Sequence, residues 1–168
     1  MDFKLKTISK SGIAEAIAKA ELYRYLNEPE EAESICRDVL AADPKHMLGL
    51  RTLGLAITDQ FTGEAFDRYA EVEAIFQRLT DPYERLYYKG LLCERRVKAQ
   101  LRAGRAPHTL LPLLEQALQC FGEAEKIHPP GNDDAILRWN RCVRLLQSQP
   151  DFEAEEVASF EAHDGPPE

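Results

Sequence analysis

The feature that most constrains this chain is a spacing that recurs ahead of three prolines, Pro44, Pro82 and Pro129. Twelve, eight and five residues before them lie mostly small or apolar residues, which are Ala32, Cys36 and Val39, then Ala70, Ala74 and Gln77, then Ala117, Phe121 and Ala124. These positions fall on one stripe of an α-helix, where small side chains let a neighbouring helix approach closely. The pattern predicts successive helical hairpins, in which each proline starts the next helix and Asp43 and Asp81 are N-caps.

A second pattern lies in the helix that opens each hairpin. Its clearest copy is Leu50, Leu53, Gly54 and Ile57, with looser copies at Ala16, Lys19, Ala20 and Tyr23, at Tyr88, Leu91, Leu92 and Arg95, and at Trp139, Cys142, Val143 and Leu146. This is the spacing W-x-x-L-G-x-x-Y, and with it the chain resembles the tetratricopeptide repeat (TPR) family over residues 13–147. The chain departs from the family at Gln77 and Leu92, where small residues are usual, and its landmark prolines are 38 and 47 residues apart. The family's period is about 34.

The apolar periodicity predicts an all-α chain, because apolar residues recur at three and four positions and not at two. The expected helices are 13–26, 29–42, 45–60, 64–79, 83–103, 109–127 and 133–147. The TPR resemblance implies a right-handed superhelical stack of about three TPR-like helical hairpins plus a C-terminal capping helix. An ordinary helical bundle would use the same apolar stripes. The expected organisation is an N-terminal lead-in over 1–12, the repeat domain over 13–147, and an acidic tail over 148–168.

Charge is unevenly distributed along the chain. The net charge is −8, and residues 148–168 carry seven acidic residues and no Lys or Arg, which leaves 21 basic and 22 acidic residues in the remainder. A nearly neutral body does not favour nucleic-acid binding. Phe152, Val157 and Phe160 interrupt the acidic tail. We expect the tail either to be solvated or to use these side chains as anchors.

The sequence shows no motif for catalysis or for binding a cofactor. It lacks zinc spacing, a P-loop and hydrolase signatures, and its four histidines are not expected to share a helix face with a Cys or Asp pair. The four cysteines are far apart, which favours reduced core thiols in a cytoplasmic protein. No apolar run is long enough for a membrane span, and the N-terminus is not typical of a secretory signal. We therefore expect a protein without enzymatic activity, metal or other cofactor.

The resemblance to the TPR family implies that the first helix of each hairpin lines a concave groove for partner peptides. The implied partner-binding residues are Ile17, Glu21, Arg24, Leu48, Arg51, Leu55, Lys89, Cys93, Arg96, Asn140 and Arg144. Five of these are basic and one is acidic, which predicts a positive groove unless the Arg stems merely cover apolar surface. One TPR subtype clamps a chaperone's C-terminal carboxylate, but its clamp slots here hold Ile17, Glu21, Thr52, Leu86 and Gly90, which do not supply the required donors.

The resulting functional hypothesis is an adaptor or scaffold that binds a protein or peptide segment, acidic with hydrophobic anchors, in the groove. If the acidic tail is anchored by its apolar side chains and not solvated, the same hypothesis has it compete for that groove within the same chain. Two alternatives stay open. One is a dedicated chaperone for a client or secreted protein, and the other is a scaffold that assembles with copies of itself. No membrane partner is expected, and the basic clusters near Arg95 and Arg141 are more typical of charged outer helix faces than of a nucleic-acid site.

Overall fold

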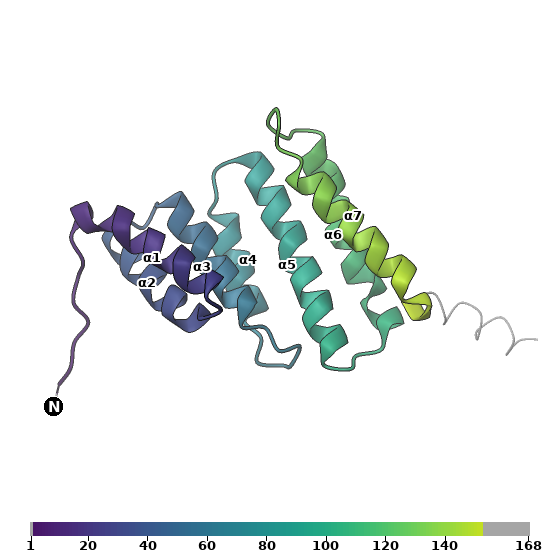
Figure 1. Cartoon of the computed structure of the whole chain (residues 1–168), viewed down its shortest axis with the longest axis horizontal. Helices are drawn as coiled ribbons and strands as arrows, with labels where there is room; N and C mark the ends of the chain where they lie inside the picture. The colour runs from purple at the N-terminus through teal and green to yellow at the C-terminus, as the bar shows by residue number, and fades with distance from the viewer. Residues whose placement is uncertain (1, 153–168) are drawn as a thin grey trace, which may run out of the picture. The chain divides into compact units, whose positions relative to one another are not determined.

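A computed structural model describes residues 2–152 of the chain, and within them the secondary structure is helical with no strand (Figure 1). This confirms the all-α prediction. The seven α-helices of this part are α1 (Ile13–Tyr25), α2 (Pro29–Ala42), α3 (Met47–Asp59), α4 (Tyr69–Gln77), α5 (Pro82–Arg102), α6 (Leu111–Glu125) and α7 (Asp134–Ser148). Three short 3-10 helices accompany them, η1 (Lys10–Gly12), η2 (Pro107–Leu110) and η3 (Pro150–Phe152).

The chain forms two compact units. Unit 1 contains the residues up to Phe61 together with Phe66–Arg85, and unit 2 contains Thr62–Ala65 together with the residues from Leu86 onward. The division falls within α5, whose first four residues belong to unit 1. The predicted repeat domain, 13–147, therefore extends over both units, and residues 153–168 of the predicted acidic tail lie outside the described part.

Unit 1 is built from neighbouring helices that pack in chain order. α1 packs against α2, α2 against α3, and α3 against α4, while α1 also contacts α3. The predicted stripe ahead of Pro44 lies in this core, where Ala32 and Cys36 are fully buried. The stripe predicted ahead of Pro82 is wrong, because Ala70, Ala74 and Gln77 are exposed, and α4 instead buries Val72, Ile75 and Phe76. The closest approach is at Gly54 on α3, where an added Cβ would lie 2.6 Å from Cζ of Phe76 on α4. This contact explains why a glycine is needed in the middle of α3.

Unit 2 contains the same kind of close contact between a glycine and an aromatic ring. An added Cβ at Gly90 on α5 would lie 2.8 Å from Cε1 of Phe121 on α6, and α6 packs in turn against α7. The sequence pattern placed the glycine-like slot of α5 at Leu92, which instead is a core residue with 1% exposure. The close approach is therefore two residues earlier than predicted. Phe152 of η3 is buried and anchors the chain after α7, where η3 packs against η2 and α7.

The observed starts of the helices show that the predicted role of the prolines is right for one helix and wrong for two. α5 begins at Pro82 as expected, and Oδ1 of Asp81 accepts a hydrogen bond from the Tyr83 N–H at 2.9 Å. The other two landmark prolines do not start helices. α3 begins at Met47, and its N-cap is His46, whose Nδ1 accepts from the Gly49 N–H at 2.9 Å. α7 begins only at Asp134, four residues after the Pro129-Pro130 pair.

The start of α4 is the largest boundary error. The predicted helix begins at residue 64, whereas α4 begins at Tyr69. Gly63 has a φ of +86° and lies so close to the Ala99 carbonyl that a Cβ would overlap it. A residue in the left-handed conformation interrupts a right-handed helix, and glycine is the residue that adopts this conformation without strain.

Candidate functional site

The predicted groove residues are divided between the two units, with six in unit 1 and five in unit 2. In unit 1, Ile17 has 5% exposure and belongs to the core, while Glu21 is exposed to solvent. Arg24 is engaged, because its Nε donates to Oδ2 of Asp59 on α3 at 2.7 Å. On α1, therefore, Glu21 is the predicted groove residue that remains available to a partner.

The predicted residues of α3 are also held within unit 1. Nη1 of Arg51 lies 2.9 Å from Oε1 of Glu84, at the start of α5, and both side chains are mostly buried. Leu48 and Leu55 are half-buried. Acidic partners thus neutralise both arginines that the prediction assigned to this part of the groove. The positive groove that the charge count predicts has little support in unit 1.

The predicted residues of unit 2 have mixed surroundings. Cys93 is fully buried, so its side chain is part of the core. Lys89 is exposed and Arg96 is half-buried on α5, and Asn140 and Arg144 are exposed on α7. Unit 2 therefore carries the predicted residues that offer both exposure and positive charge.

The outer face of α1 is an apolar surface that the sequence prediction missed. Leu22, Tyr25 and Leu26 have exposures of 54%, 88% and 55%, and they lie three and four residues apart on the helix. The exposed Ala14 and Ala18 continue the same face toward the start of the helix. α1 is thus apolar on its buried stripe and on its outer side. The signal was present in the sequence, where apolar residues recur at positions 14, 18, 22 and 25.

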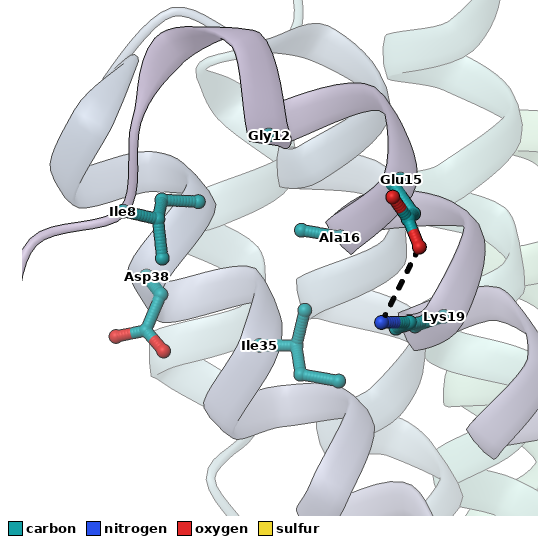
Figure 2. A pocket seen from close by; sticks show the side chains of 7 residues that line it. All are labelled: Ile8, Gly12, Glu15, Ala16, Lys19, Ile35 and Asp38. Carbon is teal, nitrogen blue, oxygen red and sulfur yellow. Dashed lines mark ion pairs between the residues drawn. The ribbon is translucent and has the colours of Figure 1, made fainter.

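Two hollows flank α1. The first, shown in Figure 2, has a volume of about 220 Å³ and is lined by Ile8, Gly12, Glu15, Ala16, Lys19, Ile35 and Asp38. Glu15 and Lys19 are solvent-exposed and Asp38 is half-buried, and Lys19 Nζ lies 3.5 Å from Glu15 Oε1. The second, of about 600 Å³, is lined by Lys10, Ile13, Ala14, Ala42, Asp43, Pro44 and His46.

A network of charges centred on Glu33 fixes α2 to the start of α4. Arg68 donates two hydrogen bonds to the Glu33 carboxylate, each of 2.7 Å, and Arg37 and Gln60 donate to it as well. The Arg68 hydrogen bonds are the main reason that the pKa of Glu33 falls from 4.5 to about 2. Arg37 also donates to Glu71 at 2.8 Å. The network is fully paired, which is typical of a structural role.

A second charged cluster lies inside unit 2. Glu94 on α5 is completely buried, and its Oε1 lies 2.5 Å from Lys98 Nζ and 3.5 Å from Nη1 of Arg138 on α7. Neither carboxylate oxygen accepts a well-aligned hydrogen bond. Arg138 also hydrogen-bonds to Tyr87. This cluster ties α7 to α5.

The four cysteines are free, buried thiols, and burial raises the pKa of Cys36 and of Cys142 to about 12. A protonated, inaccessible thiol is a poor nucleophile and a poor metal ligand. Residues 2–152 also contain no group of three His, Cys, Asp or Glu side chains that could hold a metal ion, and no helix there is long and apolar enough to cross a membrane.

Comparison with known proteins found no match: no family model matches the sequence, and no curated protein or solved structure matches it either. The TPR resemblance therefore rests on residue spacing alone. The candidate site rests on the surfaces of α1 and α7.

Proposed function

We propose that this protein is a binding module for another protein, without enzymatic activity, and that the partner contacts the outer face of α1. The observation that carries the proposal is the second apolar face of α1, formed by Ala14, Ala18, Leu22 and Tyr25. A helix that is apolar on both sides is usually covered on both sides. Folded proteins rarely leave contiguous apolar surface exposed to water unless that surface binds a partner.

The helical hairpins support the TPR resemblance as a proposal. Gly54 meets Phe76 and Gly90 meets Phe121, so the same small-to-aromatic contact joins the two helices of successive hairpins. Repeated hairpins commonly present extended surfaces to partners. The right-handed superhelical stack implied by the family remains a prediction.

The chemistry of α1 favours a partner that contributes apolar side chains. The exposed charges of α1 are few: Glu21 lies at the edge of the face, Lys19 pairs with Glu15 at 3.5 Å, and Arg24 is paired with Asp59. An acidic partner segment, as the groove hypothesis expects, would have to use Lys89 or Arg144 in unit 2. Tyr25 is suited to be an energetic centre of the contact, because interface hot spots are enriched in tyrosine.

Affinity capture with matched variants tests the proposal. The baits are the wild-type chain, Leu22→Asp/Tyr25→Asp, and Phe66→Asp, which removes an aromatic side chain with 92% exposure elsewhere in unit 1. We expect the double variant alone to lose a partner, by roughly thirtyfold for a contact worth about 2 kcal/mol. Thermal unfolding confirms that each bait is folded. A captured set that is the same for all three baits contradicts the proposed surface.

Self-association is the outcome that would favour the scaffold alternative. If the outer face of α1 binds a second copy, sedimentation will show a concentration-dependent dimer that Leu22→Asp/Tyr25→Asp abolishes. Lys89→Glu tests the predicted groove separately, because Lys89 is exposed and makes no ion pair in the described part of the chain. Arg51 is less suitable, since its replacement would leave Glu84 without its partner.

A further inference from the structure

The outward side of α7 combines an exposed apolar side chain with two arginines. Leu137 has 62% exposure, and Arg141 and Arg144 follow it at four and seven residues on the same helix face. Within residues 2–152, neither arginine has an ion-pair partner, in contrast to Arg138 on the buried side of the helix. The exposed Asn140 lies beside them. This face, called the α7 face below, therefore offers apolar contact and unneutralised positive charge together.

We propose that the α7 face is the binding site for residues 153–168 of the same chain. That segment contains six acidic residues and no Lys or Arg, so its charge is opposite to that of the α7 face. Val157 and Phe160 supply apolar side chains between Glu156 and Glu161. The mixed acidic and apolar segment thus complements the mixed basic and apolar surface.

The position of Phe152 makes this contact accessible within one chain. Phe152 is buried with 2% exposure, which fixes the start of residues 153–168 close to the end of α7. From Ser148 back to Leu137, the helix extends about 17 Å at about 1.5 Å per residue. The sixteen residues after Phe152 can extend to roughly 50 Å, which is ample. Tethering at this distance gives an effective concentration of about a millimolar, so weak affinity is enough.

The consequence concerns the use of unit 2 by partners. Asn140 and Arg144 belong both to the α7 face and to the predicted groove. While residues 153–168 occupy the α7 face, these side chains are covered, and a partner must displace the segment to reach them. The proposal does not depend on the α1 surface, so either can fail without the other.

Zero-length cross-linking of the full-length chain tests the contact. Arg141→Lys keeps the positive charge and supplies an amine, which a carbodiimide joins only to a carboxylate in direct contact. The native Lys126 is the control, because it is an exposed amine of unit 2 at the end of α6 and away from η2 and η3 in the chain. We expect position 141 to be joined to glutamates of residues 153–168 about tenfold more often than position 126, since tethering holds the segment on the α7 face.

Two additions make the experiment decisive. Leu137→Asp or Phe160→Asp, placed in the Arg141→Lys chain, should each reduce the cross-link severalfold, because each removes an apolar contact. A mixture of isotopically heavy and light chains should yield cross-links within one isotope only. Equal yields at positions 141 and 126, or yields unaffected by Leu137→Asp and Phe160→Asp, overturn the proposal. Abundant heavy-to-light cross-links overturn it in favour of binding to a second copy.

Discussion

Replacing Glu33 by glutamine should destabilise unit 1 in a way that depends on pH. The carboxylate accepts hydrogen bonds from Arg68, Arg37 and Gln60, and its side chain is only 13% exposed. Glutamine has nearly the same shape but no charge. Glu33→Gln therefore leaves two guanidinium groups in place without the carboxylate that they surround.

The magnitude follows from the pKa of Glu33. A fall from 4.5 to about 2 means that the folded state favours the ionised form. At 1.36 kcal/mol per pKa unit the full shift would contribute about 3 kcal/mol, and partial exposure of the arginines reduces this to about 2 kcal/mol. Because the folded pKa is lower than the unfolded one, this stability is present above about pH 4.5 and is lost as the pH falls toward 2.

Urea unfolding of the wild-type chain and Glu33→Gln at several pH values measures the effect. We expect the variant to be about 2 kcal/mol less stable at pH 7, and the difference to shrink by more than half between pH 5 and pH 3. Glu123→Gln, which removes an exposed pair with Lys126, is the control and should change stability by about 0.5 kcal/mol or less. A difference that is independent of pH, or no larger than that of the control, would refute the reasoning.

Three further outcomes are expected. Gly54→Ala should cost about 1–3 kcal/mol, because its Cβ would lie 2.6 Å from Phe76 Cζ, and Phe76→Leu in the same chain should restore part of that loss in thermal unfolding. His46→Ala should cost about 1 kcal/mol by removing the acceptor for the Gly49 N–H, whereas His46→Asp should retain most of the stability. A thiol reagent at pH 8 should modify less than one of the four cysteines in the native chain and all four in urea, because all are buried and burial raises the pKa of Cys36 and Cys142 to about 12.

Apolar periodicity predicted the helices well because it reports directly on which side of a helix is buried. The expected 29–42 coincides with α2, and the starts of α1 and the extent of α5 differ by no more than one residue. The errors arise where a local contact overrides the pattern. Gly63 is held against the Ala99 backbone, which is distant in sequence, and this delays α4 to Tyr69.

The candidate site was harder to predict, since its availability depends on partners that are remote in the sequence. Arg24 and Arg51 carry the positive charge expected of the groove, but they form ion pairs with Asp59 and Glu84. Conversely, Leu22 and Tyr25 belong to a helix that has apolar residues on two opposite faces. The periodicity of apolar residues therefore could not say which of the two faces is exposed. The exposed charges of α7 could be identified from sequence as a basic cluster, but their lack of ion-pair partners could not.

The path of the loop after α3 limits how the protein can be divided for experiments. Thr62–Ala65 belongs to unit 2, although unit 1 supplies the residues on both sides of it. The chain thus crosses from one unit to the other three times, and a single break cannot separate them. A gene fragment that starts at Leu86 would lack Gly63 and leave the Ala99 backbone uncovered. Dissection of the two units therefore requires point substitutions in the full-length chain.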